Sequence, residues 1–106
     1  MSIEMVNHPS HYNQEGRKEC IEEMEELFGK FETAKWALIT AYKYLYRAGT
    51  KADNSFEQDM SKVDWYITYA RNFKPESESQ FNEIVKVFNS VKAEFDRIAA
   101  SSGWAE

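Results

Sequence analysis

The chain contains few residues that cross-link or interrupt a fold. Among its 106 residues Cys20 is the one cysteine, so a disulfide within the chain and a four-thiolate zinc site are both excluded, and we expect a reducing, cytoplasmic compartment. Two prolines and four glycines leave long stretches without a helix breaker. No apolar run of roughly 18 residues occurs and the first residues form no basic segment, so we expect neither a membrane span nor a secretory signal.

Basic residues are also scarce relative to acidic ones. The 13 lysines and arginines face 18 aspartates and glutamates, which gives a net charge of −5 at pH 7. This balance opposes non-specific attraction to nucleic acid or to an anionic membrane, so we expect neither as a partner. Hydrophobic residues, in contrast, make up 42% of the chain and aromatic residues 15%, which is enough for the core of one globular domain across residues 1–106.

The apolar residues recur at spacings of three and four in several segments, which is the period of an α-helix. Gly29, Gly49 and Pro75 separate these segments, and Ser77 with Gln80 forms a capping pattern. No segment alternates with a period of two, so we expect an all-α fold, a small bundle of about four helices. The predicted helices span about residues 18–28, 31–48, 55–73 and 77–102.

The pattern of expected helices divides the chain into a leader, a core and a last helix. Residues 1–17 are expected to form an ordered N-terminal loop or lid, residues 18–73 a helical core, and residues 77–102 a C-terminal helix. The helix at 31–48 is apolar almost all round, so we expect it to be central or shared with a second chain. With 7 Phe, 6 Tyr and 3 Trp, a small bundle has more apolar surface than it can bury, which predicts a homo-oligomer.

Positive charge is concentrated between residues 43 and 51, where Lys43, Arg47 and Lys51 occur without any acid. Lys43 and Arg47 are four positions apart, so both side chains can reach one point beside a helix, where they repel each other unless an anion lies between them. Further rings and cations lie nearby or in the next expected helix: Tyr44, Lys62, Trp65 and Tyr66. Cations among aromatic rings suit a phosphate joined to a base. The alternative is that the cations complement a helix dipole and lie in water.

The segment before the first expected helix is also rich in polar and aromatic side chains, including His8, His11 and Tyr12. A His-x-x-His pair could hold a metal together with Cys20 or Glu19, but no second clustered pair follows, so we assign no metal ligand. We favour contact with a ligand, over which this segment closes as a lid. Packing of Tyr12 on the bundle, with hydrogen-bonded histidines, stays open as the structural alternative.

Five ordered blocks of residues contain most of these features. They read Asn7-His8-Pro9-x-His11-Tyr12, Gly16 with Glu19-Cys20-Ile21-Glu22, Lys43-Tyr44-Leu45-x-Arg47-Ala48-Gly49-x-Lys51, Asp59-x-x-Lys62 and Trp65-Tyr66. Together they resemble a family of small phage proteins of unknown function, some members of which are described as nucleotide kinases. The resemblance covers about residues 7–69 and leaves the last expected helix outside. It implies a phage or prophage origin, a location in the host-cell cytoplasm and the handling of deoxynucleoside monophosphates.

The resemblance and the cations together imply a nucleoside monophosphate kinase. The chain lacks the G-x-x-x-x-G-K-[ST] loop that holds phosphates in P-loop kinases, so side chains must hold them. Such a transfer needs positioning and charge neutralisation more than a strong base. We assign catalysis to Arg47, Lys43 and His11, with ATP as the expected phosphate donor and Mg²⁺ as a compatible ion. The predicted ligand-binding residues are His8, Tyr12, Glu19, Glu22, Tyr44, Lys51, Lys62, Trp65 and Tyr66.

Two other functions stay open. An all-α nucleotide pyrophosphohydrolase holds magnesium with acidic clusters, and Glu22-Glu23-x-x-Glu26 matches the first half of its pattern, E-E-x-x-E. The second half, E-x-x-D, is absent, because Glu57-x-Asp59 and Glu94-x-Asp96 have a spacing of two, and a solvated helix face explains the glutamates more simply. A protein that sequesters a nucleotide, such as a host signalling nucleotide during infection, could use the same cations and rings without any chemistry.

Overall fold

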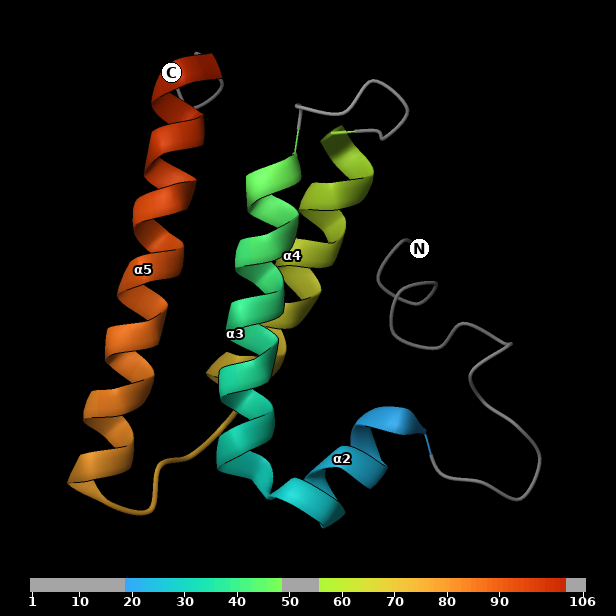
Figure 1. The fold of residues 1–106 in the computed structure, drawn as a ribbon, viewed down its shortest axis with the longest axis vertical. Coiled ribbons are helices and arrows are strands. Elements are labelled where there is room, and N and C mark those ends of the chain that lie inside the picture. Colours follow the sequence, from blue (N-terminus) through green and yellow to red (C-terminus); the bar gives the residue numbers. More distant parts are fainter. Residues whose placement is uncertain (1–18, 49–55, 103–106) are drawn as a thin grey trace.

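The computed structural model describes residues 19–48 and 56–102 (Figure 1). These residues form helices and the connections between them, with no strand in either range, so the all-α prediction is confirmed. The helices are α2 (Cys20–Phe28), α3 (Lys30–Arg47), α4 (Phe56–Arg71) and α5 (Glu78–Ser102). Each overlaps its predicted range closely. The loop expected at residues 1–17 lies outside the described residues.

A single glycine separates α2 from α3 and turns the chain sharply. Gly29 has a φ of 90°, a left-handed value that residues with a side chain rarely adopt. Its N–H donates to the Glu25 carbonyl at 2.9 Å, and its own carbonyl accepts from the Thr33 N–H at 3.1 Å and from the Thr33 hydroxyl at 2.8 Å. As a result α2 lies across the beginning of α3, at the lower end of the bundle in Figure 1.

The start of α5 is fixed by a pair of capping hydrogen bonds. The Gln80 N–H donates to the Ser77 hydroxyl at 3.1 Å, and the Gln80 side-chain oxygen accepts from the Glu76 N–H at 2.9 Å. Pro75 precedes this cap and lacks the N–H that would extend α4. The capping pattern predicted at Ser77 and Gln80 is therefore confirmed, and α5 runs back toward the end of α3 that holds Arg47 (Figure 1).

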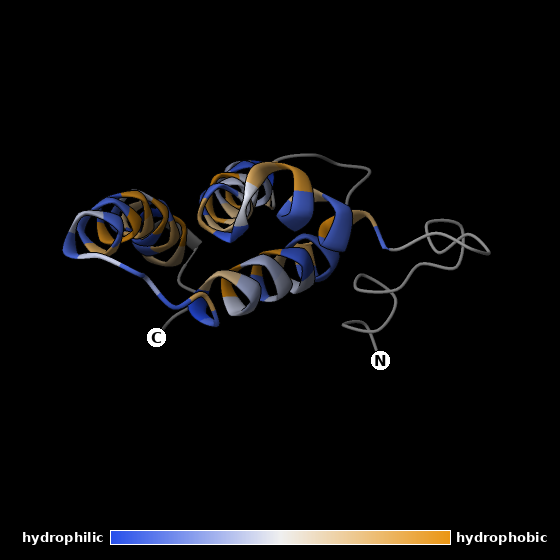
Figure 2. Cartoon of the chain, turned by 90° about the horizontal axis from the view of Figure 1, so that it is seen from below, coloured by the Kyte–Doolittle hydropathy of each residue, from blue (hydrophilic) through white to orange (hydrophobic). Residues whose placement is uncertain are grey.

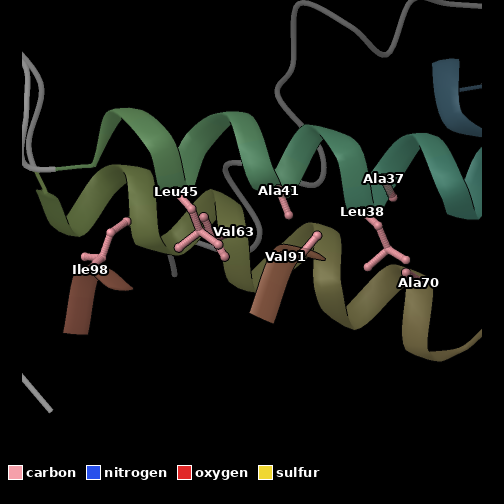
Figure 3. Close-up of a cluster of buried hydrophobic side chains, with 8 residues drawn as sticks. All are labelled: Ala37, Leu38, Ala41, Leu45, Val63, Ala70, Val91 and Ile98. Atoms are coloured by element: carbon pink, nitrogen blue, oxygen red, sulfur yellow. The ribbon is translucent and has the colours of Figure 1, made fainter. Parts of the chain in front are cut away.

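The central helix is α3, because it packs against both α4 and α5. On its inner face Ala37 and Ala41 have 0% of their surface exposed, and their small side chains let the neighbouring helices approach closely. Figure 3 shows the core side chains between the helices. The core cluster contains Ala37, Leu38, Ala41, Leu45, Val63, Ala70, Val91 and Ile98. The predicted central position of this helix is confirmed.

The long helices, seen nearly end-on in Figure 2, carry both hydrophobic and hydrophilic residues. Besides Trp36, large apolar side chains stay exposed on α3 at Ile39 (59%), Tyr42 (40%) and Tyr46 (64%). Ile39, Tyr42 and Tyr46 follow one another at spacings of three and four, so these three side chains form one continuous surface, here called the outer strip. No described helix is both long and apolar enough to span a membrane.

Candidate functional site

Three cations from two helices gather around the ring of Tyr44. Lys43 Nζ lies 4.8 Å from the ring centre, Lys62 Nζ 5.0 Å and the Arg47 guanidinium carbon 5.5 Å. Lys43 and Arg47 come from the last turns of α3, and Lys62 comes from α4, which runs antiparallel beside it (Figure 1). We call these four residues the cation cluster. The structure thus brings together four of the predicted site residues.

Helix geometry and ring packing both favour this gathering. Positions 43 and 47 are one helical turn apart, so their side chains share a face of α3. Tyr44 is held half-buried between α3 and α4, because its ring stacks on Tyr66 with centres 6.0 Å apart and an angle of 8° between the planes. Each cation–ring contact contributes about 0.5–1 kcal/mol at an exposed site. These contacts offset part of the repulsion among three like charges.

One carboxylate adjoins the cluster. Asp59 of α4 is 1% exposed, and its Oδ1 lies 3.7 Å from Arg47 Nε. Its Oδ2 receives no hydrogen bond within the described ranges. Over the same part of the chain, Lys43 and Lys62 have no carboxylate within ion-pair distance. Within the described ranges Asp59 is the carboxylate at ion-pair distance from Arg47, and the charges of Lys43 and Lys62 leave this part of the cluster with a net positive charge.

Asp59 is absent from the predicted site residues, although the sequence carries a signal for it. Its position falls on the apolar face of α4, three residues after Phe56 and four before Val63. A carboxylate on a buried face needs a charged or hydrogen-bonding partner. Arg47, close by on α3, is such a partner.

A chain of aromatic rings leads from the cation cluster toward α2. Tyr66, which stacks on Tyr44, also meets Trp36 edge-on with ring centres 5.4 Å apart and Trp65 edge-on at 5.0 Å. Trp65 in turn stacks on Tyr69, with centres 5.8 Å apart. The structure thus brings the predicted Trp65 and Tyr66 beside the cluster. It also adds two rings that were not predicted, Trp36 and Tyr69.

The ring chain ends at a pocket between α2 and the connection from α4 to α5. The Tyr69 hydroxyl donates to the Glu25 carboxylate of α2. Burial, and then this hydrogen bond, raise the pKa of Tyr69 above its usual 10.0, so the hydroxyl stays protonated. The pocket has a volume of about 380 Å³. It is lined by Glu25, Lys30, Tyr69, Asn72, Phe73, Lys74 and Glu76.

The remaining predicted site residues fall into two groups. Glu19 and Glu22 lie at α2, at the opposite end of α3 from Arg47, so the structure does not bring them to the cation cluster (Figure 1). The others lie outside the described residues: His8, His11, Tyr12 and Lys51. Within the described ranges, no group of three histidine, cysteine, aspartate or glutamate side chains could hold a metal ion.

Comparison with known proteins identifies the family of the chain, but the family has no known activity. A family model described as a protein of unknown function (DUF3310) matches residues 6–68, which is more than half of the chain and agrees with the range of the resemblance found in the sequence. The match includes the whole cation cluster, whereas Tyr69 and residues 72–76 of the pocket lie beyond it. No curated protein and no solved structure matches the chain. The chain therefore belongs to DUF3310, a family of unknown function.

Proposed function

We propose that the chain binds a nucleotide and that the cation cluster is its phosphate site. The observation that carries the proposal is the gathering of Lys43, Arg47 and Lys62 within 5.5 Å of one ring centre. These cations repel one another, and a phosphate between them replaces repulsion by attraction. Two unit charges about 4 Å apart interact by about 1 kcal/mol in water and by about 4 kcal/mol near a protein surface.

The aromatic rings beside the cluster suit the base of the same nucleotide. Trp65 and Tyr66 are half-buried, so each keeps some exposed surface on which a base can stack. Such stacking contributes about 1–3 kcal/mol per base in proteins that bind single-stranded nucleic acid. The planar guanidinium of Arg47 can donate two parallel hydrogen bonds to one phosphate, which a lysine cannot do.

The reaction we propose at this site is phosphoryl transfer from ATP to a deoxynucleoside monophosphate. An oxygen of the acceptor phosphate attacks the γ-phosphorus, a new P–O bond forms, the bond to the β-phosphate oxygen breaks, and ADP and a deoxynucleoside diphosphate leave. The attacking oxygen is already ionised, so positioning and charge neutralisation supply most of the acceleration. Arg47 and Lys43 hold the transferring group. ATP enters as a Mg²⁺ complex, and His11 completes the catalytic residues.

The origin and assembly of the protein belong to the same proposal. The resemblance to phage proteins supports a phage or prophage origin and activity in the host-cell cytoplasm. The outer strip formed by Ile39, Tyr42 and Tyr46 supports self-association, because apolar side chains gain stability when a second copy covers them. Sedimentation of the purified chain tests this, and a monomer at all concentrations would contradict it.

Turnover by the purified chain tests the proposed function. The chain is incubated with ATP, Mg²⁺ and each deoxynucleoside monophosphate in turn, and the products are separated by ion-exchange chromatography. Formation of a deoxynucleoside diphosphate and ADP in equal amounts supports the kinase. Tight binding without product would support sequestration instead, and pyrophosphate release from a triphosphate would support the hydrolase. Absence of any nucleotide binding would contradict the whole proposal.

A further inference from the structure

The pocket between α2 and the α4–α5 connection differs in charge from the cation cluster. Its lining contains two lysines, Lys30 and Lys74, and two glutamates, Glu25 and Glu76. The lining therefore has no net formal charge. Its volume of about 380 Å³ falls within the range of small-molecule sites. An uncharged group therefore suits this pocket better than a phosphate does.

The other lining residues offer flat rings and an amide. The Phe73 ring contacts Phe31 of α3 with centres 5.9 Å apart, and Tyr69 is held by its hydrogen bond to Glu25, so both rings are fixed before a ligand enters. The exposed Asn72 side chain has both a donor group and an acceptor oxygen. Rings beside an amide suit a planar heterocycle with donor and acceptor edges, which is the chemistry of a nucleobase.

The pocket and the cation cluster lie along one face of α4. Lys62, Tyr66 and Tyr69 follow at spacings of four and three, and Phe73 continues the turn because its N–H donates to the Ala70 carbonyl at 3.1 Å. Lys62 and Tyr69 are seven residues apart, a rise of about 10 Å along a helix. In a monophosphate the phosphate is attached directly to the sugar, so a base in the pocket would leave this phosphate short of the cation cluster. A triphosphate extends two phosphates further.

We propose that this pocket is a second nucleotide subsite, which holds the base of a nucleoside triphosphate whose phosphates extend along the rings to the cation cluster. The inference rests on the proposed function and goes beyond it, because it gives donor and acceptor nucleotides separate base sites. The acceptor base stacks on Trp65, which leaves the face of Tyr66 to the phosphates of the donor, and the donor base lies among Tyr69, Asn72 and Phe73. The γ-phosphate and the acceptor phosphate then meet at the cation cluster.

Calorimetric titration of the full chain with ATP, and separately with each deoxynucleoside monophosphate, tests this subsite. Asn72→Ala removes an exposed amide, and we expect it to weaken ATP binding about tenfold through lost hydrogen bonds. The same change should leave monophosphate binding within about twofold of wild type, because Asn72 lies away from the proposed monophosphate site and distant sites usually affect binding independently. Phe73→Leu removes the flat ring and should weaken ATP about fivefold through lost stacking. Asn89→Ala, which removes an exposed amide on α5, is the matched control and should change neither affinity.

The possible outcomes separate this inference from the proposed function. If both pocket variants leave ATP affinity unchanged while wild type binds monophosphates, the subsite is wrong and the proposed function stands. If Asn72→Ala weakens ATP and monophosphates equally, the pocket is no separate subsite. If wild type binds no nucleotide, the proposed function fails and the subsite fails with it.

Discussion

Lysine side chains on the two sides of α3 have opposite surroundings. Toward α5, Lys35 Nζ lies 2.6 Å from Glu83 Oε2 and 3.5 Å from Glu32 Oε1, so its charge is matched within the fold. Toward α4, Lys43 and Lys62 instead share the ring of Tyr44. Matched charges hold neighbouring helices together, whereas crowded charges of one sign cost stability until an anion arrives. If the proposed function holds, the ion pairs toward α5 stabilise the fold, whereas the crowded cations toward α4 bind phosphate.

Substitutions in the core that both sides share should change stability most. Leu38 is 1% exposed, and Leu38→Ala should lower the free energy of unfolding by about 2–5 kcal/mol through the cavity it leaves. The neighbouring Ile39 is 59% exposed, so Ile39→Ala should cost less than about 0.5 kcal/mol in the dilute chain. Urea denaturation of both variants measures the difference, and equal losses would contradict the burial that separates inside from outside on α3.

Replacing arginine by lysine on each side should separate an effect on binding from an effect on stability. Arg47→Lys keeps a positive charge beside the buried Asp59 but loses the two-pronged contact with phosphate, so nucleotide binding should weaken roughly 10- to 100-fold at nearly unchanged melting temperature. Arg97→Lys, on α5 beside Glu94, should leave binding unchanged. Calorimetric titration of both variants gives the answer, and similar losses in the two would place the phosphate elsewhere. Arg47→Ala is less selective, because it also leaves Asp59 without its cation.

Removing one lysine from each side should change stability with opposite signs. Lys62→Gln relieves repulsion in the cation cluster, so without ligand it should raise the melting temperature slightly and should weaken nucleotide binding about fivefold, a change of about 1 kcal/mol. Lys35→Gln breaks the contacts with Glu32 and Glu83, so it should lower the melting temperature slightly and leave binding unchanged. A fall in both melting temperatures would show that Lys62 supports the fold rather than the site.

The pair of Glu94 and Arg97 on α5 should give stability a slight dependence on pH. The hydrogen bond from Arg97 is the main cause that holds the pKa of Glu94 below its usual 4.5. A lowered pKa gives stability that is present above 4.5 and disappears as the pH falls through the lowered value. Glu94→Gln should therefore be less stable than wild type at neutral pH, and the difference should shrink in acid. Urea denaturation across this pH range measures it, and a constant difference would contradict the ion pair.

Local patterns explain why so much of the fold could be predicted from the sequence. The period of the apolar residues, Gly29 and the Ser77–Gln80 cap set the helix ranges, and each of these signals acts over a few residues. The approach of Lys43 and Arg47 follows from their four-residue spacing. Lys62 joins them because consecutive helices in a small bundle tend to pack antiparallel.

The features that could not be predicted depend on how distant segments meet. The pocket requires α2 to lie against the end of α4, where Glu25 and Tyr69, 44 residues apart, share a hydrogen bond. No short-range pattern specifies that pairing. The same placement of α2 keeps Glu19 and Glu22 away from the cations, although both belong to the blocks that carry the resemblance. Asp59 was predictable in principle, because an acid on an apolar helix face requires a partner.

Removing equal charge from two places on the protein distinguishes a phosphate site from ordinary surface lysines. Two double variants remove the same amount of charge, Lys43→Gln with Lys62→Gln in the cation cluster, and Lys35→Gln with Lys92→Gln where carboxylates already match the lysines. Calorimetric titration with a deoxynucleoside monophosphate should show at least about 20-fold weaker binding for the first pair, corresponding to about 2 kcal/mol, and wild-type affinity for the second. Equal affinities of the two double variants would contradict the claim that the cation cluster binds phosphate.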